Sequence, residues 1–83
     1  MDEKLLEFAV KAIIAHLHAN PASADTAEGI HQWWIHWPTF PESIEVTFAA
    51  LEQLEQSGFI EHLKVGNREI WRRPRTSEVV SAD

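Results

Sequence analysis

The chain has 83 residues, enough for one small domain with a single hydrophobic core. Hydrophobic residues make up 45% and charged residues 24%, as in a folded globular protein rather than a disordered one. Cysteine is absent, which excludes a disulfide framework and a thiolate zinc site. The net charge of −6 is unevenly placed: residues 1–63 hold ten acids against Lys4 and Lys11, whereas residues 64–83 hold five bases against three acids.

Apolar residues at three- and four-residue steps predict a first helix over residues 3–18. The stripe consists of Leu6, Ala9, Val10, Ile13 and Leu17. Asn20-Pro21 is expected to end this helix, because proline cannot continue the hydrogen-bond ladder and disfavours helix in the residue before it.

A second helix is predicted from a capping box over Asp25-Thr26-Ala27-Glu28, with Asp25 accepting from early amides and Glu28 reaching back. It is expected to run to about Ile35, since Pro38 forbids continuation. Its buried side is expected to consist of Ile30, Trp33 and Trp34.

The link through Thr39 and Pro41 is expected to start a third helix, with Glu42 in its first turn. One arc of this helix, at 100° per residue, contains Ile44, Thr47, Phe48, Leu51 and Leu54. Gly58 is expected to close the helix in a left-handed conformation.

Two short strands are predicted next, over residues 59–64 and 68–73, around a Gly66-Asn67 turn. A two-residue turn pairs Val65 with Arg68, Lys64 with Glu69, Leu63 with Ile70, His62 with Trp71 and Glu61 with Arg72. This register produces two pairs of opposite charge and one apolar pair, which favours it. The domain is therefore predicted over residues 1–73, with a short disordered tail over 74–83.

The order helix, helix, turn, helix and hairpin resembles the winged helix-turn-helix superfamily over residues 4–73. Thr26-Ala27-Glu28-Gly29-Ile30 looks like the opening of that family's second helix. The stretch LEQLEQSGFI, residues 51–60, looks like the "L-x-x-L-x-x-x-G-L-I" entry into its wing. The resemblance implies an α+β, mostly α fold: three helices and a C-terminal two-stranded β-hairpin, the wing.

In DNA-binding relatives the third helix lies in the major groove and offers polar or basic side chains. The matching positions here are Glu42, Glu45, Val46, Ala49, Ala50 and Gln53. This helix carries four glutamates and neither lysine nor arginine, and carboxylates oppose binding to phosphate. A small apolar strip, Val46-Ala49-Ala50, rimmed by glutamate suits a protein surface better than a nucleic acid.

The wing supports an alternative function. Its basic residues are able to reach phosphates or a minor groove, as family wings do; they are Lys64, Arg68, Arg72, Arg73 and Arg75. Glu61 and Glu69 lie opposite two of these residues and neutralise part of the charge. A solvated hairpin whose arginines keep an edge strand soluble is the plainer interpretation.

Trp33, Trp34 and Trp37 form the most unusual local feature. Core positions are expected for Trp34 and for at least part of Trp33, whereas Trp37 in the turn is expected to be exposed and to act as an interface anchor. Trp71 is expected to cover His62 on the wing rather than to stack on a base.

No catalytic, metal or cofactor site is predicted. Glu28-x-x-His31 has the spacing of a carboxylate-histidine pair, but a di-metal bundle needs a second copy and further carboxylates. A glycine-rich phosphate loop is absent from the sequence, and the serines fit cap and turn positions better than nucleophilic ones.

We therefore expect a non-enzymatic interaction or adaptor module that binds a protein partner or a second copy of itself, without membrane or small-molecule ligand. The alternative is transcription-regulator-like DNA binding through the wing. The acidic start MDEKLLEFAV lacks the pattern of a signal peptide, so a cytoplasmic location is expected.

Overall fold

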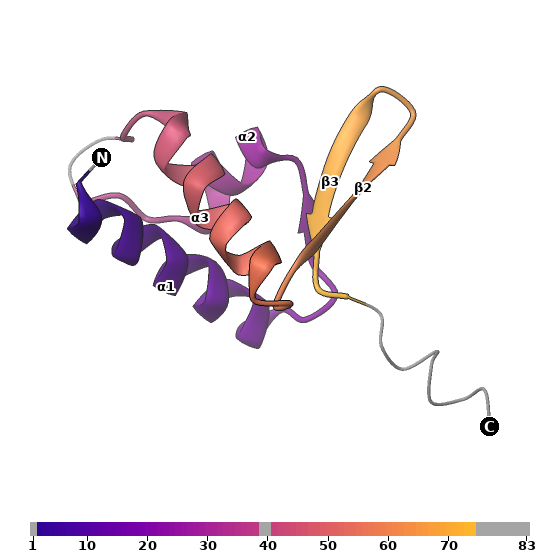
Figure 1. The fold of residues 1–83 in the computed structure, drawn as a ribbon, viewed down its shortest axis with the longest axis horizontal. Helices are drawn as coiled ribbons and strands as arrows, with labels where there is room; N and C mark the ends of the chain where they lie inside the picture. The colour runs from indigo at the N-terminus through magenta and orange to yellow at the C-terminus, as the bar shows by residue number, and fades with distance from the viewer. Residues whose placement is uncertain (1, 39–40, 75–83) are drawn as a thin grey trace.

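The computed structural model describes residues 2–38 and 41–74. Its elements are α1 (Glu3–Ala19), β1 (Ala24–Asp25), α2 (Ala27–Gly29), η1 (Ile30–Trp34), α3 (Ile44–Gln56), β2 (Glu61–Val65) and β3 (Arg68–Arg72). The helices form one body, and the β2–β3 hairpin stands beside it (Figure 1). The predicted α+β, mostly helical fold class is confirmed, and three helices followed by an antiparallel hairpin are compatible with winged-helix topology.

Helix α1 is capped at both ends by its own polar residues. The Asp2 side chain accepts a hydrogen bond from the Lys4 N–H at 2.8 Å, which satisfies one free amide of the first turn. At the other end, the Asn20 side chain donates from Nδ2 to the His16 carbonyl at 3.2 Å, and the Asn20 backbone N–H donates to the same carbonyl at 2.8 Å. The prediction of this helix is confirmed, with its last residue, Ala19, one position later than expected.

The second helical segment starts at a different cap from the one predicted. Asp25 as the N-cap is wrong, because Asp25 belongs to β1, where it pairs with Trp71 of β3. The N-cap is Thr26, whose hydroxyl accepts from the Gly29 N–H at 3.1 Å. The Asp25 carboxylate instead accepts from the Thr26 N–H at 2.7 Å.

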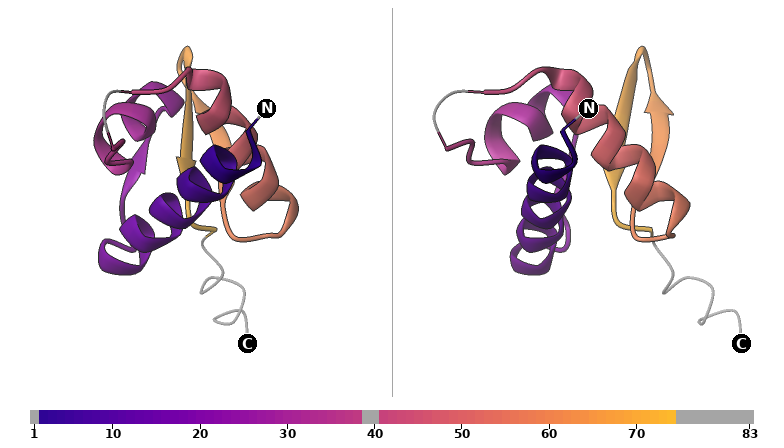
Figure 2. Two further views of the ribbon diagram at one scale, coloured as in Figure 1. Left: turned by 90° about the vertical axis from the view of Figure 1, so that its left-hand side faces the viewer. Right: turned by 60° about the vertical axis from the view of Figure 1, so that its left-hand side comes forward.

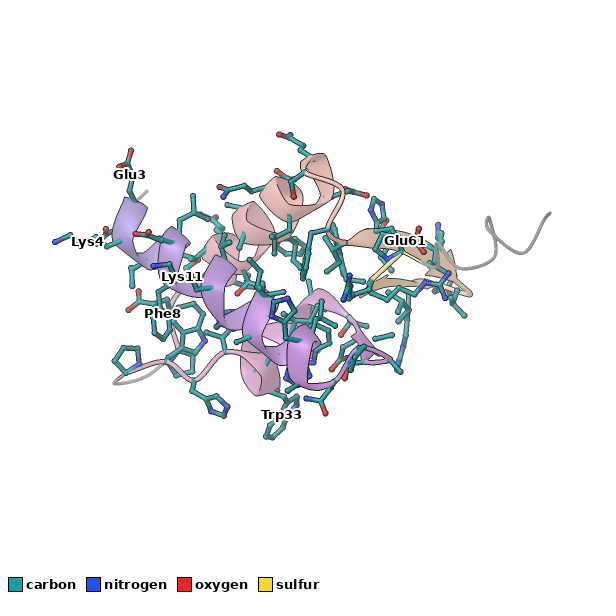
Figure 3. All side chains as sticks on the ribbon, turned by 90° about the horizontal axis from the view of Figure 1, so that it is seen from below. Glu3, Lys4, Phe8, Lys11, Trp33 and Glu61 are labelled. Atoms are coloured by element: carbon teal, nitrogen blue, oxygen red, sulfur yellow. The ribbon has the colours of Figure 1, made fainter. Side chains whose placement is uncertain are left out.

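The segment then continues as the π-helix η1, in which the neighbouring residues Trp33 and Trp34 differ in burial. Trp34 is 5% exposed and belongs to the core, as predicted. Trp33 is 71% exposed, so the expectation that it is partly buried is wrong. Figure 3 shows the Trp33 side chain projecting away from the body of the protein.

Helix α3 begins later than predicted but ends as predicted. Its N-cap is Ser43, whose hydroxyl accepts from the Glu45 N–H at 3.2 Å, so Glu42 lies before the helix and not in its first turn. Thr39, in the expected link, lies outside the described residues. At the C-terminus Gly58 has a φ of +84°, and the Phe59 N–H donates to the Leu54 carbonyl at 3.0 Å.

The hairpin has the predicted register at all five pairs, from Val65 opposite Arg68 to Glu61 opposite Arg72. Strand β2 starts at Glu61 rather than Phe59, because Phe59 and Ile60 belong to the connection from α3. Strand β1 has no counterpart among the elements predicted from the sequence; it pairs with the other edge of β3, so the sheet order is β1-β3-β2.

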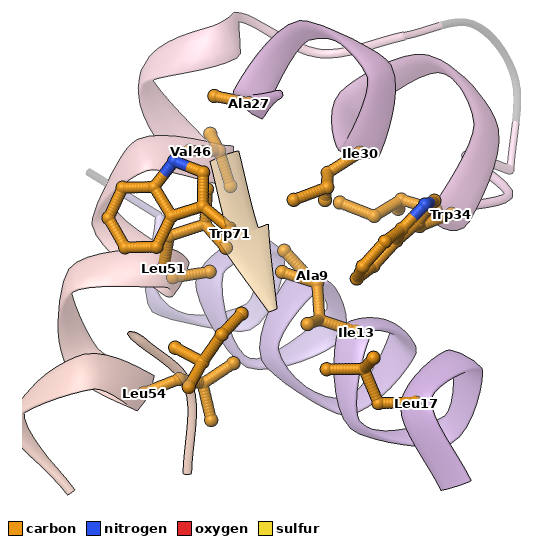
Figure 4. Packing of buried hydrophobic residues seen from close by; sticks show 13 residues of the cluster. Ala9, Ile13, Leu17, Ala27, Ile30, Trp34, Val46, Leu51, Leu54 and Trp71 are labelled. Atoms are coloured by element: carbon orange, nitrogen blue, oxygen red, sulfur yellow. The ribbon is translucent and has the colours of Figure 1, made fainter. Parts of the chain in front are cut away.

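The core forms where α3 packs against both α1 and the α2–η1 segment, with β3 closing one side (Figures 2 and 4). Its buried apolar side chains include Ile13 and Leu17 of α1, Ile30 and Trp34 of η1, Val46, Leu51 and Leu54 of α3, Trp71 of β3, and Ile35 and Ile60 from the segments that follow η1 and α3. Ala9 and Ala50 are both fully buried on the facing helices α1 and α3. Alanine at these positions allows the two helices to approach closely.

Gly29 provides a test of the junction between β1 and α2. A Cβ at this position overlaps the Asp25 carboxylate, so in Gly29→Ala that side chain must turn away and lose its hydrogen bond from the Thr26 N–H, which should destabilise the fold by about 0.5–1.5 kcal/mol. Urea denaturation measures this change in the free energy of unfolding. In an Asp25→Ala background the same substitution should be neutral or stabilising, since alanine favours helix over glycine. An equal loss in both backgrounds contradicts the assignment.

Candidate functional site

The solvent-exposed surface of α3 is acidic. With one side of the helix facing α1 and α2–η1, the exposed side chains on the other side are Glu45, Phe48, Glu52 and Gln56, which we call the acidic face. Helix α3 also carries Glu55, and it contains neither lysine nor arginine. Negative charge on this face therefore has no cation within the helix to offset it.

The structure corrects part of the predicted face. Val46 is 6% exposed and Ala50 is fully buried, so the expected apolar strip Val46-Ala49-Ala50 is not on the surface. Ala49 is half-buried, and Gln53 is exposed but lies beside α1. The physical reason is that α1 and α2–η1 cover α3 from two directions, which makes its buried arc wider and rotated relative to the one predicted.

Phe48 supplies the apolar surface that the buried strip does not. Phe48 lies on the arc predicted from the sequence together with Thr47, Leu51 and Leu54, but it is 39% exposed whereas these three are buried. Together with Trp71 it lines a surface pocket of about 440 Å³ between α3, the start of α2 and the wing, whose remaining walls are Thr26, Ala27, Glu28, Asn67, Arg68 and Glu69. An exposed aromatic ring beside a concavity is a suitable place for an apolar side chain of a partner.

The basic residues of the wing differ in what they contact. Arg72 donates from Nε to the Glu61 carboxylate at 2.9 Å, and the Arg73 guanidinium lies 5.1 Å from the centre of the Phe59 ring. Lys64 and Arg68 are exposed on either side of the Gly66-Asn67 turn. Arg75 lies outside the described residues.

Trp37, predicted as an exposed anchor, is half-buried. Its Nε1–H donates to the His31 carbonyl at 3.0 Å, and its ring packs 5.8 Å from Phe8 and 5.2 Å from His31, measured between ring centroids. The ring thus attaches the segment after η1 to α1, and the expectation of an exposed Trp37 is wrong. The exposed tryptophan of the trio is Trp33.

Two histidines, His31 and His62, form side-chain hydrogen bonds within the fold. His31 is 8% exposed, and its Nδ1 lies 2.6 Å from the hydroxyl of Thr47, which is fully buried on α3. On the wing, His62 Nδ1 lies 2.7 Å from the Glu55 carboxylate, and the His62 and Trp71 ring centroids are 4.6 Å apart. The expected ring contact is present, but His62 is exposed and Trp71 is buried, so the expectation that Trp71 covers His62 is wrong. Among residues 2–38 and 41–74, no group of three or more potential ligands is arranged to hold a metal ion.

Comparison of the chain with protein-family models, with curated proteins and with solved structures finds no match. None of the helices in the described part of the chain is long and apolar enough to cross a membrane. The function is therefore argued from the chain's own residues.

The His31–Thr47 hydrogen bond sets the rotation of α3 against η1, and Thr47→Val tests its contribution. The substitution keeps the shape but leaves a buried imidazole nitrogen without its partner, so the free energy of unfolding should fall by about 1–3 kcal/mol. Thr47→Ser retains the hydroxyl and serves as the control in the same thermal or urea denaturation. Equal stability of the valine variant and the parent contradicts this role.

Proposed function

We propose that this chain is a winged-helix interaction module that binds a protein partner through the acidic face of α3. The observation that carries the proposal is the exposed surface of α3, where Glu45 and Glu52 flank a partly exposed Phe48 and lysine and arginine are absent. A surface with this charge fits a partner whose own surface is basic and partly apolar.

The charge of α3 argues against a helix that enters a DNA groove. Nucleic-acid affinity comes largely from cations that replace the counterions of phosphates, and α3 contributes three glutamates and no cation. Each carboxylate placed near a phosphate raises the free energy of the complex. The same carboxylates favour lysine or arginine side chains of a protein, and they also select against acidic competitors.

The apolar part of the proposed site is the Phe48 ring with the pocket beside it. Trp71 forms a second aromatic wall, while Glu28 and Glu69 add negative charge to the rim. Arg68, in the same rim, offsets part of this charge. A partner segment with basic residues next to an apolar one matches this arrangement, since charges govern encounter and orientation while the apolar contact supplies affinity. We assign no catalytic role to these groups.

The same site supports a first test with peptides of defined chemistry. Fluorescent peptides in which lysine or arginine alternates with apolar residues should bind the parent, and their acidic counterparts should not. Glu45→Gln/Glu52→Gln should weaken binding by about two- to thirtyfold in fluorescence polarisation, as expected for the loss of two exposed ion pairs. Phe48→Ala should weaken it further by removing the apolar contact.

A matched control raises the net charge by the same amount elsewhere. Ala22→Lys/Gln32→Lys adds two positive charges at exposed positions outside α3 and should weaken binding less than the glutamine pair. If the parent binds no basic-apolar peptide, or if both double variants have the same effect, the proposed interface on α3 is wrong.

DNA contact through the wing is the second candidate function, and the exposure of Lys64 and Arg68 at its turn favours it. Two cations support only weak phosphate binding, and Arg72 is already paired with Glu61. We expect no mobility shift of duplex DNA even near ~50 mM salt, the condition that favours binding. A shift that disappears steeply with added salt, and that Lys64→Ala/Arg68→Ala abolishes, establishes the wing as a DNA contact instead.

A further inference from the structure

A second surface lies along α1, on the side of α3 that Gln53 borders. Leu6, Val10 and Ile14 are half-buried and line an open groove of about 620 Å³ between α1 and α3. Its polar border consists of Glu3, Glu7, Lys11 and Gln53. Figure 3 shows Glu3 and Lys11 along α1, with Lys4 in its first turn. We call this surface the α1 groove.

The apolar residues of the α1 groove form a ridge of a kind that packs against another helix. Leu6, Val10 and Ile14 are spaced by four residues and extend over about 12 Å at the helical rise of 1.5 Å per residue. Ridges with this spacing pack between the same ridges of a second helix when the two helix axes cross at about −50°. The contact is therefore available between two identical helices.

The charges of the α1 groove indicate which helix fits. Glu3, Glu7 and Lys11 form a second row, also spaced by four residues, that borders the apolar ridge. Lys11 and Glu7 form an ion pair at 3.4 Å, and their side chains are 75% and 65% exposed. Lys11 is one of only two cations in residues 1–63. This row carries both signs of charge, whereas the acidic face of α3 carries only one.

We propose that a second copy of this chain occupies the α1 groove, with its α1 antiparallel to that of the first. A two-fold axis near Val10 brings the two apolar ridges together and places Lys11 of one copy next to Glu7 of the other. Each copy then contributes the same cation and the same anion, as an isologous interface requires. The acidic faces of α3 cannot pair in this way, because each repels its copy.

The size of the interface determines the strength that we expect. A stable interface buries about 800 Å² on each partner, roughly one seventh of the 5695 Å² accessible surface of this chain. The apolar ridge is short, so the charged row and Gln53 must contribute to the contact. We expect a dimer that dissociates on dilution through the micromolar range. It uses a surface separate from the proposed partner site and does not depend on it.

Sedimentation equilibrium measures the mean molecular mass at protein concentrations from about 1 to 500 µM, and circular dichroism checks that each variant is folded. The parent should change from monomer to dimer over this range. Lys11→Glu makes the row entirely acidic, and Glu7→Lys places a second cation one turn before Lys11. In either variant alone, like charges then face each other across the two-fold axis, so the dimer should be about two- to thirtyfold weaker than that of the parent. An equimolar mixture of the two should dimerise more strongly than either alone, because opposite charges then meet across the interface.

The mixture distinguishes the interface from a structural effect, since a change within one chain cannot be restored by another chain. Ala22→Glu, at an exposed position after the end of α1 and outside the groove, is the control and should dimerise like the parent. A parent that stays monomeric at 500 µM overturns the proposal, and so does a mixture no stronger than its components. If Glu45→Gln/Glu52→Gln strengthens the dimer and the α1 variants leave it unchanged, self-association takes place through α3. That outcome also overturns the proposal. Peptide binding to α3 is measured separately, so the two proposals fail independently.

Discussion

The rotation of α3 about its own axis determines which side chains the protein presents. Two contacts set this rotation: the His31–Thr47 hydrogen bond, buried between η1 and α3, and the packing of the fully buried Ala50 in the core. With these two contacts made, Val46 faces inward while Glu45, Phe48 and Glu52 face solvent. A rotation by one residue, or about 100°, would exchange the acidic face for an apolar one. The proposed partner site therefore depends on a hydrogen bond within the core.

The wing and the helices divide the charge of the molecule between them. Cations are concentrated in and after β2, but Arg72 pairs with Glu61 and Arg73 packs on Phe59, so part of that charge supports the hairpin itself. Helix α1 balances Glu3 and Glu7 with Lys4 and Lys11, whereas α3 carries three glutamates and neither lysine nor arginine. A fold compatible with winged-helix topology thus presents, at the position of a groove-reading helix, a surface that repels phosphate.

The two proposed surfaces have different chemistry because the two helices have different charge patterns. Helix α3 has one sign of charge and a partly exposed aromatic ring, which suits a partner with the opposite pattern. Helix α1 has both signs next to an apolar ridge, which suits its own copy. Since Gln53 of α3 borders the α1 groove, the two surfaces are neighbours. A dimer through α1 leaves both acidic faces available, so it presents two partner sites together and raises the effective affinity for a bivalent partner.

Local chemistry in the sequence was enough to predict α1, the end of α3 at Gly58 and the complete register of the hairpin. A proline, a left-handed glycine and a two-residue turn act within a few residues, so no distant contact is needed to recognise them. Strand β1 and the exposure of Trp33, Trp37, Val46, Ala50 and Phe48 depended on the tertiary structure. Two residues become a strand only when β3 lies beside them, and the buried arc of α3 is set by the two helices that cover it. Periodicity identifies an amphipathic helix, but the number and direction of its neighbours decide how far round that helix burial extends.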